Sequence, residues 1–238
     1  MQSNQEEKFF MLKDVALGRL SPDRIPMFFW GSLIYSAVAT GVSLFGILQN
    51  EHLITPLIKT MFQVSMISFL LHLLFTLFYS IPRMSYKFQR FQMVIVSLIT
   101  IKVSLEAYQF FFVASITGLA PDYVINTGII VLIGGFVYFI ISLIRGIKRV
   151  QQGELKKGGK GLYEFKSSKA YISIPIIFAA SMLGGSIGRN FSDPSTSFGL
   201  FFALFLCAVL QYTIAMAWPE FLLVTYAKYK FKSFNVKY

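Results

Sequence analysis

Apolar residues fall into six long runs separated by short polar segments. A helix needs about 20 residues to cross a hydrocarbon core, and most of the runs are close to this length. The fifth run is the shortest. Hydrocarbon offers the backbone no hydrogen-bond partner, so each run is predicted to be a helix. The runs are Met27–Leu48, Leu57–Ser80, Val94–Ile116, Tyr123–Ile144, Tyr171–Ile187 and Phe198–Trp218.

This pattern predicts an all-α fold, a polytopic integral membrane bundle of six transmembrane helices. The composition agrees, because 14% of the residues are charged, whereas soluble domains carry about 25%. Residues 1–26 are predicted to form a cytoplasmic N-terminal segment, residues 27–227 the transmembrane domain, and residues 228–238 a basic cytoplasmic tail. The N-terminal segment is polar and does not resemble a cleavable signal, so the first run is expected to act as an uncleaved insertion signal.

Lysine and arginine gather in the segments that six spans would place on one side. These segments are the N-terminus, the second and fourth loops and the tail, and they hold almost all of the 22 Lys and Arg residues. The positive-inside rule puts this side, with both termini, in the cytoplasm. The excess of Lys over Arg and the many Phe and Ile residues are typical of an AT-rich bacterial genome, so we expect a bacterial plasma membrane. The net charge of +11 is then a topology signal, and nucleic acid is not expected as a partner because no soluble domain is present to carry a basic face.

The N-terminal segment contains a candidate interfacial helix over residues 6–20. Phe9, Leu12, Ala16 and Leu20 recur at helical spacing on one side. A helix with such an apolar face binds at the headgroup region of a bilayer. A solvated tail is the alternative interpretation.

The loop 146–169 is the one sizeable soluble segment, and it is strongly basic. Its Gly-Lys cluster lacks the spacing of a phosphate-binding loop. A flexible loop attracted to anionic lipid headgroups is predicted, with about 1 kcal/mol contributed by each charge near the surface. Protein docking is the alternative. The residues expected to make these contacts are Lys148, Arg149, Lys156, Lys157 and Lys160.

Lys102 and Glu106 stand four residues apart, deep inside the third run. Charge near a bilayer centre costs roughly 2.5–3.5 kcal/mol per residue. The second and third runs are joined by a short loop and should form an antiparallel hairpin, which brings residue 102 level with about residue 69. Polar residues follow one face of each helix at helical spacing. We therefore predict a buried polar seam of Ser65, Ser68, His72, Lys102, Glu106 and Gln109.

Two interpretations of this seam compete. In the structural one, Lys102 and Glu106 neutralise each other, and the remaining groups supply interhelical hydrogen bonds of roughly 0.6–2 kcal/mol each. In the functional one, the seam is an ion, proton or substrate site, as intramembrane ionisable residues usually are. The self-compensating pair favours the structural interpretation.

The segment from Gly184 to Gly188 matches G-x-S-x-G, with Ser186 at its centre. The motif marks a nucleophile elbow in soluble hydrolases and is similar to the serine motif of rhomboid-type intramembrane proteases. A protease needs a histidine base, but His72 is predicted to lie too deep and nothing fixes His52. Close helix packing by small residues explains the segment better. The stripe consists of Ala180, Gly184 and Gly188.

No enzyme activity, metal or cofactor is expected. The single cysteine, Cys207, has no ligand partners for a metal site. The function predicted is that of a non-catalytic accessory or interaction subunit, of the secretion-complex or toxin-immunity type. The alternative is a transporter or channel subunit for a small solute, an ion or protons, but the two halves share no motif and show no paired broken helices. The expected partners are the bilayer with its anionic headgroups and a membrane protein or a second copy of the chain.

Overall fold

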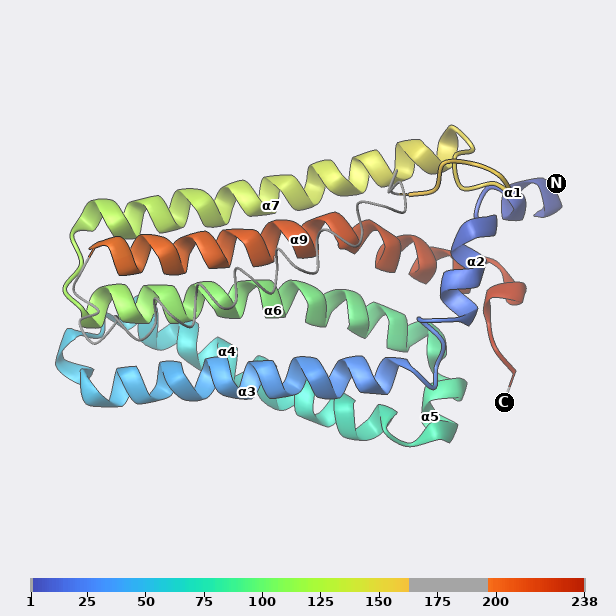
Figure 1. Cartoon of the computed structure of the whole chain (residues 1–238). Helices are drawn as coiled ribbons and strands as arrows, with labels where there is room; N and C mark the ends of the chain where they lie inside the picture. Colours follow the sequence, from blue (N-terminus) through green and yellow to red (C-terminus); the bar gives the residue numbers. More distant parts are fainter. Residues whose placement is uncertain (1, 163–196, 238) are drawn as a thin grey trace.

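The computed structural model describes residues 2–162 and 197–237, and every regular element within these ranges is a helix (Figure 1). Within these ranges, five helices are long and apolar enough to cross a membrane. The predicted helical bundle is therefore confirmed, whereas the predicted span Tyr171–Ile187 lies outside the described residues. The five helices are α3 (Ile25–Gln49), α4 (Pro56–Tyr79), α6 (Gln89–Thr117), α7 (Asp122–Gln151) and α9 (Ser197–Lys230).

Short helices lie at the two ends of the bundle, and proline sets the start of several elements. Pro26, Pro56 and Pro82 occupy the first turns of α3, α4 and α5, where the missing N–H is not needed. Thr55 caps α4, because its side chain accepts a hydrogen bond from the backbone N–H of Ile58 at 3.5 Å. The short elements are α1 (Gln2–Glu7), α2 (Phe10–Leu17), η1 (Glu51–Leu53), α5 (Pro82–Lys87) and η2 (Lys232–Phe234).

Helix α6 is the centre of the bundle. It contacts α3, α4, α7 and α9, and half of its most apolar stretch is buried. α7 and α9 run in the same direction, since Tyr123 stacks on Phe201 near their starts and Tyr138 stacks on Tyr212 further along. The described chain therefore leaves α7 at one end of the bundle and enters α9 at the other (Figure 1).

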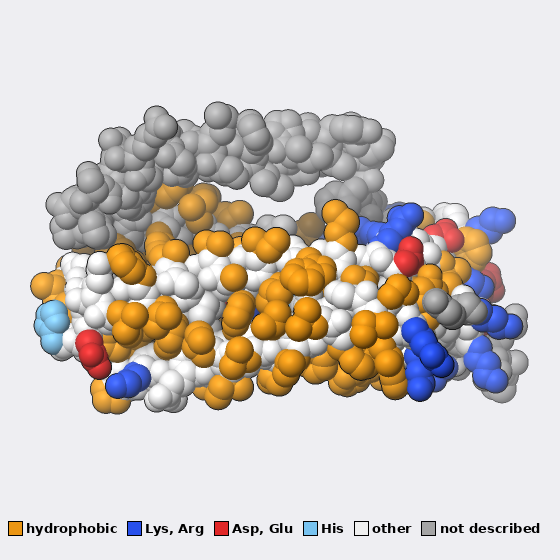
Figure 2. Space-filling view, turned by 90° about the horizontal axis from the view of Figure 1, so that it is seen from below, with side chains coloured by type: hydrophobic (Ala, Val, Ile, Leu, Met, Phe, Trp, Pro, Cys, Tyr) orange, Lys and Arg blue, Asp and Glu red, His pale blue; other side chains and the backbone are white. Residues whose placement is uncertain are grey.

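Charged side chains gather at the end of the bundle that holds both termini. Figure 2 shows Lys and Arg clustered there, with an apolar band between this end and the other. The N-terminal helices, α5 and the C-terminal residues lie at the charged end (Figure 1). We refer to it as the basic end.

The apolar face predicted for the N-terminal segment is present, but protein covers it. The ring of Phe9 lies 5.7 Å from the rings of Tyr226 and Phe231. This face therefore packs on the end of α9 and the residues after it, and it is covered by protein instead of facing lipid headgroups or solvent. Its four buried residues are Phe9, Leu12, Ala16 and Leu20.

The described part of the predicted tail 228–238, up to residue 237, also belongs to the folded bundle. α9 continues to Lys230, and Lys228 is fully buried, with its Nζ donating to the carbonyl of Leu20 at 3.1 Å. The Gln89 side chain then exchanges two hydrogen bonds with the backbone of Val236, at 2.9 and 3.0 Å. The C-terminal residues are therefore fixed to the segment after α2 and to the start of α6.

Candidate functional site

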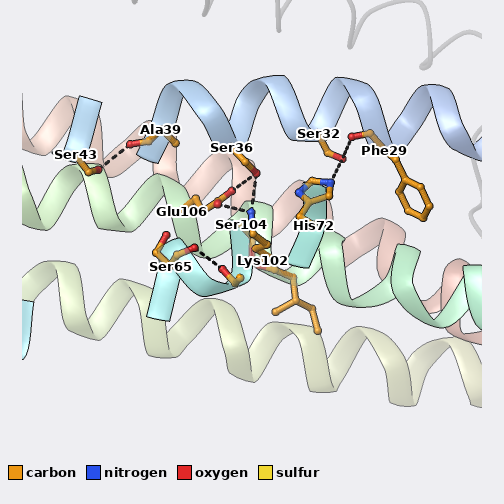
Figure 3. Close-up of polar contacts among 12 residues, drawn as sticks. Phe29, Ser32, Ser36, Ala39, Ser43, Ser65, His72, Lys102, Ser104 and Glu106 are labelled. Carbon is orange, nitrogen blue, oxygen red and sulfur yellow. Dashed lines mark hydrogen bonds and ion pairs between the residues drawn. The ribbon is translucent and has the colours of Figure 1, made fainter. Parts of the chain in front are cut away.

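Lys102 and Glu106 form an ion pair in the middle of α6, and a serine of α3 completes it (Figure 3). Lys102 Nζ lies 2.5 Å from Glu106 Oε1 and donates to Ser36 Oγ at 2.8 Å. Ser36 Oγ in turn donates to Glu106 Oε2 at 2.7 Å. Ser36 is fully buried, and the side chains of Lys102 and Glu106 are 13% and 4% exposed. These three residues are termed the polar triad.

The charges of the polar triad are compensated within it. Each carboxylate oxygen of Glu106 accepts a hydrogen bond, and the ammonium of Lys102 donates to both partners. Lys102 Nζ also lies 6.0 Å from the centroid of the Phe69 ring on α4, at the depth expected from the hairpin. Removing one member of a buried ion pair leaves an uncompensated charge, which is strongly destabilising. The triad therefore links α3 to α6, and Phe69 of α4 lies beside it.

The predicted seam contains no residue of α3, although a pattern in the sequence indicates that one face of α3 packs against other helices. Ser32, Ser36, Thr40 and Ser43 recur at helical spacing, and all four are buried on one face of α3. Small hydroxyl residues at such spacing are typical of helix interfaces in membranes. This stripe turns toward α4 and α6 (Figure 3).

His72 belongs to a separate contact. Its Nε2 lies 3.2 Å from Ser32 Oγ, and the histidine is 2% exposed. Nδ1 has no hydrogen-bond partner among the described residues. The ring therefore joins α4 to α3 one helical turn from Ser36. The prediction placed His72 in one seam with Lys102, whereas the structure gives the two residues separate hydrogen-bond partners.

A cavity of about 400 Å³ lies beside the triad, between α4 and α6, with Leu132 of α7 at its edge. Ser65 Oγ and Gln109 Nε2 are buried and have no partner among residues 2–162 and 197–237. Ser68 donates to the carbonyl of Ser65 in its own helix, at 2.8 Å. The predicted residues Ser65, Ser68 and Gln109 are therefore brought together around a cavity and do not bond to the ion pair. The wall consists of Thr60, Met61, Val64, Ser65, Ser68, Lys102, Leu105, Glu106, Tyr108, Gln109, Phe112 and Leu132.

A second buried polar link joins α6, α7 and α9. Tyr108 Oη donates to Gln211 Oε1 at 2.8 Å, and Gln211 Nε2 donates to the carbonyl of Leu132 at 3.2 Å. A Cβ atom on Gly135 would lie 1.8 Å from Gln211 Oε1, so the glycine provides the space for the amide. The lone amide within a long apolar run is the sequence signal for this link.

The basic loop is partly fixed where it leaves α7. α7 continues to Gln151, so Lys148 and Arg149 are helical. Arg149 pairs with Glu154 at 3.4 Å and donates to the carbonyls of Gly161 and Leu162. Leu155 is fully buried, so the described part of the loop is folded against the bundle. Of the five predicted docking residues, Lys148, Lys157 and Lys160 are exposed, and Lys156 and Arg149 are half-buried.

Several predicted residues lie outside the described part of the chain. These are Ser186 of the G-x-S-x-G motif and the packing stripe Ala180, Gly184 and Gly188. Among the residues that are described, no group of three or more His, Cys, Asp or Glu side chains could hold a metal ion.

Comparison with known proteins gives no match, either to a family model, to a curated protein or to a solved structure. The polar triad, the cavity and the charged surface are therefore the features that bear on function.

The ion pair predicts an unusual order of stabilities among variants. Glu106→Leu leaves the Lys102 ammonium unpaired and should lower the free energy of unfolding by about 3–5 kcal/mol. Lys102→Leu/Glu106→Leu removes both charges and should recover most of this loss. Unfolding of the purified protein in detergent, followed by circular dichroism, measures the difference. Equal stabilities of the single and double variants would contradict a buried, mutually compensated pair.

The polar triad also predicts a specific role for Ser36. Ser36→Ala removes the hydroxyl that donates to Glu106 and accepts from Lys102. It should lower the free energy of unfolding by about 1–3 kcal/mol. Ser43→Ala is the matched control, because Ser43 is equally buried but donates only to the carbonyl of Ala39 in its own helix. The same unfolding measurement applies. A loss for Ser43→Ala as large as that for Ser36→Ala would show that the hydroxyl bridge to the ion pair is unimportant.

Proposed function

We propose that the chain is a non-catalytic multi-pass membrane protein that acts as an accessory or interaction subunit through contacts inside the bilayer. Secretion complexes and toxin-immunity pairs are assemblies of the kind in which such a subunit works. The observation that carries this proposal is the cavity between α4 and α6, with two buried polar atoms that have no partner among the described residues.

The position of these atoms favours a partner helix as their binding partner. Ser65 and Gln109 lie well inside α4 and α6, where lipid tails offer no hydrogen bonds. Hydroxyl and amide side chains are the groups that form interhelical hydrogen bonds in membranes. The cavity also borders exposed apolar residues of α4, such as Val64 and Met61. A transmembrane helix with a polar side chain fits both the apolar wall and the unpartnered atoms.

We propose further that the chain crosses a bacterial plasma membrane six times, with both termini in the cytoplasm. The gathering of Lys and Arg at the basic end supports this orientation (Figure 2). The common direction of α7 and α9 supports a sixth crossing between them, because two helices that run the same way require the chain to return.

Site-specific photocrosslinking in cells tests the interaction proposal. Val64 lines the cavity and Val38 lies on α3, and the two side chains are almost equally exposed, at 61% and 62%. A photoreactive residue at Val64 should give a discrete crosslinked protein whose attachment point lies in a transmembrane segment, and one at Val38 should not. Gln109→Leu should reduce the Val64 product several-fold.

Two results of this experiment would contradict the proposal. One is a set of identical products from Val64 and Val38, which would indicate random contact in the membrane. The other is a Val64 product whose yield is unaffected by Gln109→Leu.

Transport of an ion, of protons or of a small solute is the second candidate function. The observation that favours it is that Lys102 and Glu106, an ionisable pair deep in a membrane-spanning helix, line the wall of the cavity. Ionisable residues in such positions mark substrate and proton pathways in many membrane proteins. Transport would require the polar triad to open, since every charge in it is already paired.

Flux measurements in proteoliposomes separate the two functions. The interaction proposal predicts that wild-type protein produces no proton, Na⁺ or K⁺ flux above that of protein-free liposomes. Flux in the wild type that disappears in a folded Lys102→Leu/Glu106→Leu variant would establish transport and overturn the non-transport assignment.

A further inference from the structure

A second cavity lies at the basic end of the bundle, where α5, α6 and α9 meet the C-terminal residues. Its volume is about 410 Å³. It is separate from the cavity beside the polar triad, and no residue lines both. The lining residues are Lys87, Phe88, Gln89, Arg90, Phe91, Tyr229 and Asn235.

Two cations line this cavity without a carboxylate to balance them. Lys87 ends α5 and Arg90 lies in the first turn of α6, and both side chains are exposed. No Asp or Glu is among the lining residues, and neither cation belongs to an ion pair within the described ranges. Instead, Lys87 Nζ lies 5.3 Å from the Phe88 ring centroid and the Arg90 guanidinium 6.0 Å from that of Tyr229. The cavity is therefore positively charged and lined by aromatic rings.

The walls of the cavity are held by contacts that do not use the cations. Gln89 is bound to the backbone of Val236 through both its amide atoms. Asn235 Nδ2 donates to the carbonyls of Lys228 and Phe231, at 2.9 and 3.1 Å. The C-terminal residues thus form a fixed wall opposite Lys87 and Arg90, and the cavity does not depend on a ligand to form.

One side of the cavity continues onto the apolar surface of the bundle. Phe88 and Phe91 are 40% and 46% exposed. The ring of Phe88 lies 5.8 Å from that of Phe78, and the ring of Phe91 lies 6.1 Å from that of Phe75, both on α4. These four rings make an aromatic strip that leads from the two cations toward the membrane-spanning part of α4.

We propose that this cavity binds an anionic phospholipid. Its phosphate lies between Lys87 and Arg90, and its acyl chains follow the aromatic strip of Phe88, Phe91, Phe75 and Phe78. Basic pockets between transmembrane helices at the cytoplasmic side bind such headgroups. A free phosphate ion would satisfy the cations but would leave the aromatic strip without a role. The strip and the charges together therefore identify a lipid and not a soluble anion.

Lipid binding to the intact, detergent-solubilised chain tests this site. Titration with dioleoylphosphatidylglycerol, followed by native mass spectrometry, should show one tightly retained lipid on the wild type. Lys87→Gln/Arg90→Gln should weaken its binding roughly thirtyfold, which corresponds to about 1 kcal/mol for each cation. Lys87→Arg/Arg90→Lys keeps both charges and should restore binding to within a few-fold of the wild type.

A control with the same loss of charge makes the result specific. Arg145→Gln/Lys232→Gln also removes one Arg and one Lys, both exposed and both outside the cavity, and should bind the lipid as the wild type does. Equal weakening in this control would overturn the proposal in favour of general charge attraction. Dioleoylphosphatidylcholine binding as tightly as the anionic lipid would overturn it as well, and so would inorganic phosphate displacing the lipid at millimolar concentration.

Discussion

Lys102 and Glu106 can be accommodated together inside an apolar helical bundle because they pair with each other and share the hydroxyl of Ser36 within hydrogen-bonding distance. Hydrocarbon cannot replace any of these bonds. The arrangement requires α3 to place Ser36 at the depth of the ion pair. Phe69 of α4 lies at the same depth, with its ring centroid 6.0 Å from Lys102 Nζ. The other polar links, from His72 to Ser32 and from Tyr108 to Gln211, follow the same rule. Together they determine how the helices are rotated about their axes.

The sequence predicts the five described spans well because the length and apolarity of each run reflect a single physical requirement, the crossing of a membrane. It also predicts the depth of Lys102 relative to α4, since a short loop leaves a hairpin little freedom. Ser36 was not predicted to join the ion pair, because its contact connects two helices that are distant in the chain. α4 and α5 separate α3 from α6 in the chain, and nothing in the local sequence says which distant helices become neighbours. The same limit explains why an apolar face predicted for a lipid surface, that of Phe9 and Leu12, is covered by α9 instead.

The two cavities differ in the residues that line them, and this difference distinguishes the roles proposed for them. The cavity beside Gln109 lies within the membrane-spanning part of the helices, and most of its wall is apolar. The cavity beside Arg90 lies at the basic end, and it joins cations to an aromatic strip. The first suits another protein segment, and the second suits a molecule with a charged head and an apolar tail. The two sites can therefore be occupied at the same time.

The burial of Lys228 against the carbonyl of Leu20 has a consequence for the biosynthesis of the chain. α2 leaves the ribosome first, whereas the surface that covers it belongs to the end of α9 and to the residues after it. The apolar face of the N-terminal segment can therefore reach these intramolecular contacts only after α9 has been synthesised. Packing of the N-terminal segment against the end of α9 is thus a late step in folding, which requires the C-terminal part of the described chain.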